Sequence, residues 1–193
     1  MEISVPEPHP DLKGKAPGTP LWIQADISSS EPGRAAVYGI RPREDGTAYD
    51  VVPEMVGVVD HVNQEKSLLH VVVALGIDGT WPLSDLSASA EPGMTVAVRL
   101  ASHHGRHGQR ARILSISPTT RRPGQNVCRS FNEEVEVTGS GLGFTKSGIF
   151  IPPHLVSGLG ISGGDTVEGL AIISHDKKRG KWGMKAITAK VVV

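Results

Sequence analysis

The feature that most constrains the fold of this chain is its division into short runs rich in Val, Ile and Thr, each bounded by glycine or proline. The 193 residues include 23 Gly and 14 Pro, residue types that interrupt helices and mark turns. Short β-branched runs between turn signals are typical of strands. The sequence therefore predicts an all-β protein made of small sheets.

The expected strands fall into two groups separated by a polar segment. The first group covers residues 21–27, 34–40, 48–52, 55–62, 68–75, 95–100 and 110–116, with Ile77-Asp78-Gly79 as a turn between strands. The second group covers residues 134–138, 148–151, 166–174 and 182–193. We expect a flexible Pro-rich arm (1–20), a β-rich N-terminal region (21–116) containing a degenerate OB-like barrel at 54–116, a linker (117–132) and a second barrel (133–193).

One hairpin pattern occurs in both groups, within residues 93–113 and 164–187. Each copy begins with Gly-x-Thr-Val, reaches a Ser-His pair, crosses a basic turn that contains glycine and returns as a second strand. Recurrence of a structural unit within one chain is the sequence signature of a repeat. We therefore expect a tandem duplication of one small β-barrel.

Charge is distributed unevenly, although the net formal charge is zero. Residues 1–98 contain 14 acidic and 6 basic residues, and residues 99–193 contain 6 and 14. No acidic residue stands between Pro92 and Asn132, a segment that contains Arg99, Arg106, Arg110, Arg112, Arg121, Arg122 and Arg129. Such a stretch suits phosphates, an acidic partner protein or the acidic half of the same chain.

Two phenylalanines stand in a glycine-rich context in the second group. Gly141-Leu142-Gly143-Phe144, Ile149-Phe150-Ile151 and Gly164-Asp165-Thr166-Val167-Glu168 resemble the cold-shock domain, a variety of the OB fold, over about 60 residues. The resemblance implies a five-stranded barrel whose aromatic side chains stack on unpaired bases. Phe144 and Phe150 match two of the aromatics of the family.

Three positions depart from the cold-shock pattern. Leu142 stands where the family has a further aromatic, Ser140 where it has Lys, and Pro152 where it has His, with His154 two residues later. The stacking surface implied by the resemblance is therefore incomplete, and Trp182 is our candidate to replace the missing aromatic. In the first repeat, Val58, Val59, His61 and Val62 occupy the comparable strand, so we expect that repeat to share the fold without the stacking surface.

The predicted function is binding of single-stranded nucleic acid, with RNA favoured and DNA possible. Aromatic stacking would hold the bases and basic side chains would follow the backbone. The candidate contacts are Phe144, Phe150, His154, Trp182, Lys146, Lys177, Lys178, Arg179, Lys181, Lys185, Arg106, Arg110 and Arg112. The alternative is a protein-interaction or assembly module on the same scaffold, which uses the acidic N-terminal half for a partner or for self-association.

Other kinds of site are not expected. His103, His104 and His107 lie among glycines and arginines, which disfavours a metal site, and Gly158–Gly163 has the letters Gly-x-Gly-x-x-Gly without the strand and helix of a nucleotide site. No serine stands in a nucleophile elbow, so we expect neither an enzyme nor a cofactor. The single Cys128 and the lack of a long apolar run predict a cytoplasmic protein that does not contact membrane.

Overall fold

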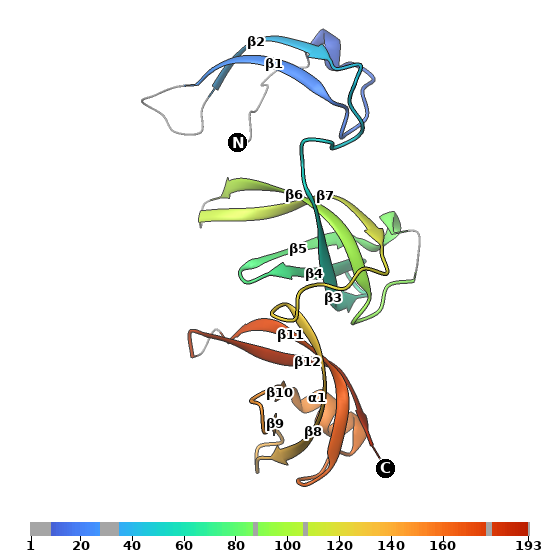
Figure 1. Ribbon diagram of the computed structural model, residues 1–193, viewed down its shortest axis with the longest axis vertical. Coiled ribbons are helices and arrows are strands. Elements are labelled where there is room, and N and C mark those ends of the chain that lie inside the picture. Colours follow the sequence, from blue (N-terminus) through green and yellow to red (C-terminus); the bar gives the residue numbers. More distant parts are fainter. Residues whose placement is uncertain (1–8, 28–34, 87–88, 106–107, 177–178, 193) are drawn as a thin grey trace. The chain divides into compact units, whose positions relative to one another are not determined.

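The computed structural model describes residues 9–27, 35–86, 89–105, 108–176 and 179–192, with side chains omitted at 102–105 and 108–110. Within these ranges the chain forms twelve strands, one α-helix and two short 3-10 helices (Figure 1). The expectation of an all-β protein with two small barrels is confirmed. None of the helices in the described part of the chain is long and apolar enough to cross a membrane.

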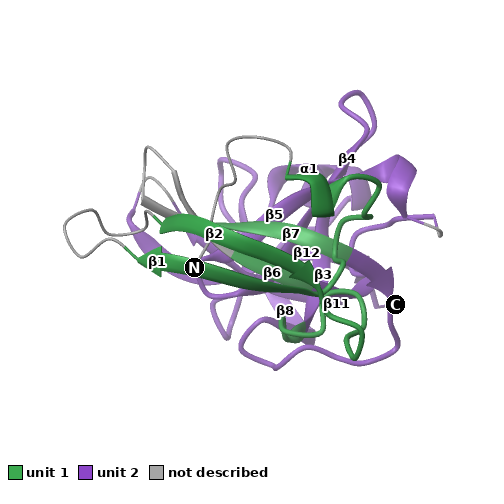
Figure 2. Cartoon of the chain, turned by 90° about the horizontal axis from the view of Figure 1, so that it is seen from above, with its two compact units in different colours: residues 1–54, 99–115 green, residues 55–98, 116–193 purple. Residues whose placement is uncertain are grey.

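The chain divides into two compact units (Figure 2). Unit 1 contains residues 1–54 and 99–115, and unit 2 contains residues 55–98 and 116–193. The division passes through strands β6 (Thr95–Gly105) and β7 (Gly108–Pro118).

Unit 1 contains a two-stranded antiparallel sheet, β1 (Leu21–Ile27) with β2 (Ala35–Pro42), preceded by the 3-10 helix η1 (Pro10–Leu12). The part of the expected arm that is described contacts the loop after β2. Tyr49 donates its backbone N–H to the Gly18 carbonyl at 2.9 Å.

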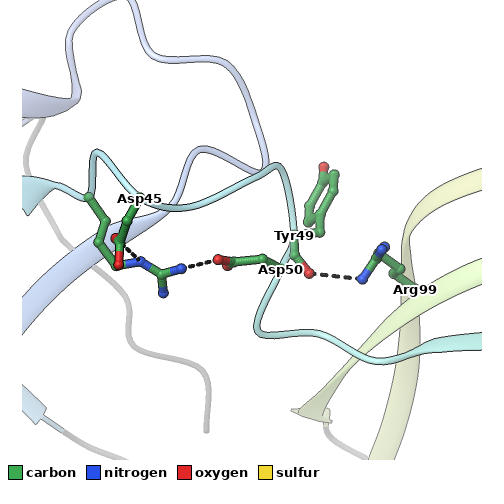
Figure 3. A network of polar contacts seen from close by, with 5 residues as sticks. Asp45, Tyr49, Asp50 and Arg99 are labelled. Atoms are coloured by element: carbon green, nitrogen blue, oxygen red, sulfur yellow. Dashed lines mark hydrogen bonds and ion pairs between the residues drawn. The ribbon is translucent and has the colours of Figure 1, made fainter.

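The strand expected at residues 48–52 is wrong, because this segment forms turns. Tyr49 has a φ of 58°, a left-handed conformation that interrupts an extended strand. Arg43 pairs with Asp50 and with Asp45, and the Arg99 guanidinium donates to the carbonyl oxygen of Tyr49 (Figure 3). Arg99 also donates to the carbonyl oxygen of Val52. The apolar pair at residues 51–52 does not mark a core strand, since Val51 is 77% exposed.

The first barrel is a five-stranded sheet in the order β5-β4-β3-β6-β7, in which β3 (Glu54–Asn63), β4 (Leu68–Ala74) and β5 (Ile77–Pro82) precede β6 and β7. The 3-10 helix η2 (Leu83–Asp85) follows β5. The turn expected at Ile77-Asp78-Gly79 is wrong, because Ile77 already begins β5. Gly76 adopts a φ of 72° and provides the reversal one residue earlier.

The second barrel is closed, in the order β10-β12-β11-β8-β9. Its elements are β8 (Cys128–Val137), β9 (Gly143–Thr145), β10 (Phe150–Ile151), α1 (Pro153–Leu159), β11 (Thr166–Asp176) and β12 (Lys181–Val191). The core is formed by inward-pointing residues of these strands together with residues of α1 and of the loops. It contains Phe131, Val135, Ile149, Ile151, Val156, Ile161, Val167, Ala171 and Ala186.

Two local expectations for the second barrel need correction. Residues 128–132, expected in the linker, begin β8, where Phe131 packs in the core. No element was predicted between the strands expected at 148–151 and 166–174, where the structure has helix α1. Pro153 suits its first turn and Gly160 ends it with a φ of 65°. Of the Gly-x-Gly-x-x-Gly run, Gly158 therefore lies within a helix and Gly160 ends it.

Within unit 2, the first sheet packs directly against the second barrel. Val58 and Val72 of the first sheet form one buried cluster with Val127 and Ile172. Ile172 is 1% exposed although it does not belong to the core of its own barrel. Burial of this kind stabilises the contact by the hydrophobic effect.

Candidate nucleic-acid interface

Phe144 and Phe150 lie opposite each other on neighbouring strands of the second barrel. They are register partners in the antiparallel pair β9–β10, and their ring centroids are 5.6 Å apart with the planes tilted by 41°. Ile149 and Ile151, on either side of Phe150, are buried in the core. Because neighbouring side chains of a strand point to opposite faces, Phe150 and its partner Phe144 lie on the outer surface, where both are half-buried.

The glycine before Phe144 is required by packing. A Cβ at Gly143 would lie 3.0 Å from the Ile151 Cβ and 3.2 Å from a methyl group of Val156. The backbone of β9 at Gly143 therefore lies against the core side chains with no room for a Cβ. The neighbouring residue, Phe144, is turned to the opposite face of the strand.

The turn between β9 and β10 is held by side-chain hydrogen bonds. The Ser147 hydroxyl and backbone N–H donate to the two carboxylate oxygens of Glu133, at 2.7 and 2.9 Å. Ile149 donates its backbone N–H to the Thr145 hydroxyl at 3.1 Å. Partial burial alone would raise the pKa of Glu133, but the hydrogen bonds from Ser147 outweigh it and the pKa is lowered. This turn sets the separation of the two phenylalanines, and Lys146 is exposed at its tip.

Lys185 on β12 is the register partner of Phe150 on its other side. Its neighbours Met184 and Ala186 belong to the core, so Lys185 faces outward beside the phenylalanine pair. The Lys185 ammonium lies 3.0 Å from Oδ1 of Asp60, a residue of β3 in the first sheet.

Asp60 and Lys185 belong to a chain of polar contacts, here called the Asp60 network, that also contains His70 and Asp78. The His70 ring nitrogens lie 3.2 Å from the second oxygen of Asp60 and 2.8 Å from a carboxylate oxygen of Asp78. The network thus extends from β5 through β4 and β3 to β12.

The charges of the Asp60 network stabilise one another. The hydrogen bond to Asp60 raises the pKa of His70; burial opposes this effect, and Asp78 adds to it. Burial would raise the pKa of Asp60, but the contacts with His70 and Lys185 outweigh it, and the pKa is lowered. An ionised Asp60 therefore lies between two cationic groups when His70 is protonated.

Trp182 lies near the end of the hairpin formed by β11 and β12. It is the register partner of His175, with ring centroids 4.9 Å apart, and it is 45% exposed. A Cβ at Gly76 would lie 3.8 Å from the Trp182 ring, so the turn between β4 and β5 also borders this side chain. One face of the indole is thus in contact with protein while part of it stays open to solvent.

Comparisons with known proteins agree with the duplicated barrel. The model for "S1/CSD-like domain 1 of the TOTE conflict systems" matches residues 49–113, and the model for "S1/CSD-like domain 2 of the TOTE conflict systems" matches residues 129–189. The chain contains two S1/CSD-like domains in tandem. A search of curated protein sequences found no match.

The phenylalanine pair belongs to S1/CSD-like domain 2, as the resemblance to the cold-shock domain implied. Domain 1 shares the fold but has Val58 and Val59 fully buried in its β3 strand. Trp81 is the aromatic side chain of its β3–β5 sheet, and it is half-buried. We find no pair equivalent to Phe144 and Phe150 in the part of domain 1 that is described.

The other predicted contacts are distributed over several elements. In domain 2, Lys181 and Arg179 are exposed near Trp182, with Arg179 3.7 Å from Asp176, and His154 is exposed on α1. Arg112 of domain 1 is exposed on β7 and belongs to unit 1. Lys177, Lys178 and Arg106 lie outside the described residues, and Arg110 is described for its backbone alone. The structure therefore brings together Phe144, Phe150 and Lys185, with Lys146 on the adjoining turn.

The Asp60 network was not predicted from the sequence. One signal was available, because Asp60 is the acidic residue within the apolar run 55–62, and charged residues within such runs are usually paired when buried. Arg99 was predicted to belong to a basic stretch. Its guanidinium instead donates to backbone carbonyls within unit 1 and lies 3.8 Å from Glu54. In the described residues we found no cluster of three or more His, Cys, Asp or Glu side chains suited to a metal.

Proposed function

We propose that S1/CSD-like domain 2 binds single-stranded nucleic acid, with RNA favoured over DNA, by stacking bases on Phe144 and Phe150. The observation that carries this proposal is the placement of both rings on the outer surface of the barrel, paired across β9 and β10 at 5.6 Å. Base stacking on an aromatic side chain contributes about 1–3 kcal/mol per base and tolerates different sequences.

Basic side chains support the proposal. Lys146 is exposed on the turn that joins the two phenylalanine strands, and Lys181 and Arg179 are exposed at the hairpin that contains Trp182. Cations of this kind bind backbone phosphates and release counterions from the nucleic acid, which makes binding sensitive to salt. His154 and Trp182 are further candidates for contact with the bases.

A binding role without catalysis and without a cofactor is part of the proposal. The residues that distinguish the site are two phenylalanines and lysines, side chains suited to stacking and phosphate contact. Cys128 is a free thiol, and free thiols persist in reducing compartments such as the cytoplasm. We therefore place the activity in the cytoplasm.

The experiment is a fluorescence-anisotropy titration with labelled single-stranded RNA, single-stranded DNA and the corresponding duplex, each of about 8 nucleotides or base pairs. Single strands are expected to bind more tightly than duplex, and affinity should fall steeply as salt is raised from about 50 to 200 mM. Absence of binding by both single strands at about 50 mM salt, where such contacts are strongest, would contradict the proposal.

A protein-interaction role is the second candidate, and the β1–β2 sheet in unit 1 favours it. Trp22, Ile23, Ile27 and Tyr38 on this sheet are exposed. Exposed apolar groups of this kind often mark interaction sites, and a two-stranded sheet is marginally stable alone. A Trp22→Ser/Tyr38→Ser variant should lose a protein partner or self-association under this hypothesis and retain oligonucleotide binding. A Phe144→Ala/Phe150→Ala variant should show the reverse.

A further inference from the structure

Asp60 occupies an irregular position in its strand. In the β3–β4 ladder Val59 pairs with Val71 and His61 pairs with His70, so the register shifts at Asp60 and leaves it as the residue of a β-bulge. A bulge turns one side chain away from the regular alternation of a strand. Here the redirected side chain meets Lys185 of S1/CSD-like domain 2.

The ion pair between Asp60 and Lys185 is largely withdrawn from solvent. The Asp60 side chain is 14% exposed and that of Lys185 is 30% exposed, with 3.0 Å between the ammonium nitrogen and Oδ1. Solvent screens such a pair less than it screens a pair on the open surface. The lysine next to Phe150 is therefore already occupied by an internal anion.

Lys185 is well placed for a phosphate of a bound strand. It is the register partner of Phe150, which is in turn the partner of Phe144, so the three side chains form one row across β9, β10 and β12. A nucleotide stacked on the two phenylalanines would have its phosphate within reach of Lys185 on the neighbouring strand β12. A carboxylate and a phosphate compete for the same ammonium group.

We propose that Asp60 of domain 1 determines the affinity of domain 2 for nucleic acid by occupying Lys185 as an internal substitute for phosphate. This inference rests on the proposed function of the phenylalanine pair. A bound strand must displace Asp60 to use Lys185. Ligand binding to domain 2 is thereby coupled to the contact that domain 2 makes with domain 1.

The rest of the Asp60 network makes the exchange feasible. When Lys185 turns to a phosphate, Asp60 keeps its contact with His70 at 3.2 Å, and His70 keeps its contact with Asp78 at 2.8 Å. The released carboxylate therefore retains a hydrogen-bond partner. A buried carboxylate without any partner would oppose the exchange strongly.

The test is a double-mutant cycle with Asp60→Asn and Lys185→Gln in the full chain, measured by anisotropy with the single-stranded oligonucleotide. Asp60→Asn should tighten binding by about fivefold or more, because the strand no longer has to displace a carboxylate from Lys185. Lys185→Gln alone should weaken binding by less than about twofold, whereas in the Asp60→Asn background it should remove the whole gain. The two effects are thus expected to be strongly non-additive.

Glu168→Gln is the matched control. Glu168 pairs with Lys190 at 3.7 Å on the exposed surface of the same domain, so this variant removes the same charge from a different lysine. It should change affinity by less than about twofold. Equal gains for Asp60→Asn and Glu168→Gln would show a general effect of charge and would overturn the proposed role of Asp60.

The outcomes separate this inference from the proposed function. If the natural chain binds the oligonucleotide and Asp60→Asn binds it equally well, the role of Asp60 is overturned but the proposed function stands. If neither the natural chain nor any variant binds, the role of Asp60 and the proposed function are both overturned. If Asp60→Asn does not fold, the natural chain provides the test through NMR titration of the His70 imidazole. Bound oligonucleotide should raise its pKa, because Lys185 leaves Asp60; an unchanged pKa in the bound state would contradict displacement.

Discussion

The rings of Phe144 and Phe150 lie 5.6 Å apart on the outer face of a barrel whose interior contains the third phenylalanine of the chain, Phe131. One residue type therefore has two environments in the same domain. Phe131 is 6% exposed and packs in the core. Substitution of the buried Phe131 therefore tests the contribution of an aromatic side chain to stability, and substitution of Phe144 or Phe150 tests its contribution to binding.

Replacement of Phe144 or Phe150 by Leu should weaken binding of single-stranded oligonucleotide by about fivefold or more for each variant, because leucine keeps apolar volume but loses the aromatic face. Phe131→Leu is the control. It should lower the free energy of unfolding by roughly 1 kcal/mol and leave affinity unchanged. Anisotropy titrations measure the affinity and urea unfolding measures the free energy of unfolding. If Phe131→Leu loses affinity while the Phe144 and Phe150 variants keep it, the bases do not stack on the outer pair.

Gly169→Ala should destabilise domain 2 by about 3 kcal/mol or more, since the added methyl group requires the backbone to move. A Cβ at this position would lie 2.1 Å from the carbonyl oxygen of Thr188 on the neighbouring strand. Gly183→Ala on β12 is the matched control, with no atom within 4 Å of its Cβ, and should change stability by less than about 1 kcal/mol. Denaturant unfolding measures the free energy of unfolding of the two variants. Equal values would be inconsistent with the close contact between Gly169 and Thr188.

Arg99→Gln should destabilise unit 1 by about 1.5–3 kcal/mol, because the guanidinium donates to the carbonyl oxygens of Tyr49 and Val52. Oligonucleotide affinity should stay the same. Arg112→Gln, at an exposed position of β7, is the matched control and should change stability by less than about 0.5 kcal/mol. Thermal unfolding compares the two variants, and equal stabilities of Arg99→Gln and Arg112→Gln would contradict the structural role of Arg99.

Stability should fall as pH rises above neutrality through the titration of His70. Asp60 and Asp78 flank its ring, Lys185 lies beyond Asp60, and the pKa of His70 is raised in the folded state. The folded protein therefore binds this proton more tightly than the unfolded chain does. The resulting stabilisation is fully present below the unfolded pKa of about 6.5 and is lost as pH rises through the higher folded value.

Thermal unfolding of the natural chain and of His70→Gln between about pH 6 and pH 9 measures this contribution. The difference in melting temperature between the two should be largest at the acidic end and should shrink toward the alkaline end. The Asp60 carboxyl stays ionised throughout this range, because its pKa is lowered. A difference that grows with pH would show that the folded state favours neutral His70.

Local patterns of the sequence predicted most strands and the duplicated barrel. Leu21–Ile27 was predicted with the bounds that β1 has, because turn signals on both sides delimit an alternating run. Residues 48–52 form a turn although Val51 and Val52 prefer strands. The left-handed conformation of Tyr49 and the ion pairs of Arg43 stabilise the turn. Helix α1 was not predicted, because it has only seven residues, contains Gly158 and ends at Gly160. So short a segment shows no helical periodicity.

The sequence by itself determined that the chain forms two related small barrels and that two phenylalanines stand where a cold-shock domain has its aromatics. Those properties depend on residues close together along the chain, such as Gly143 beside Phe144. Only the tertiary structure decided how the charges are used. Arg99 donates to backbone carbonyls of a turn in unit 1, and Lys185 pairs with Asp60 where the two sheets of unit 2 pack together. Both contacts depend on the distance between groups in space, and segments far apart in sequence acquire that distance only when the chain folds.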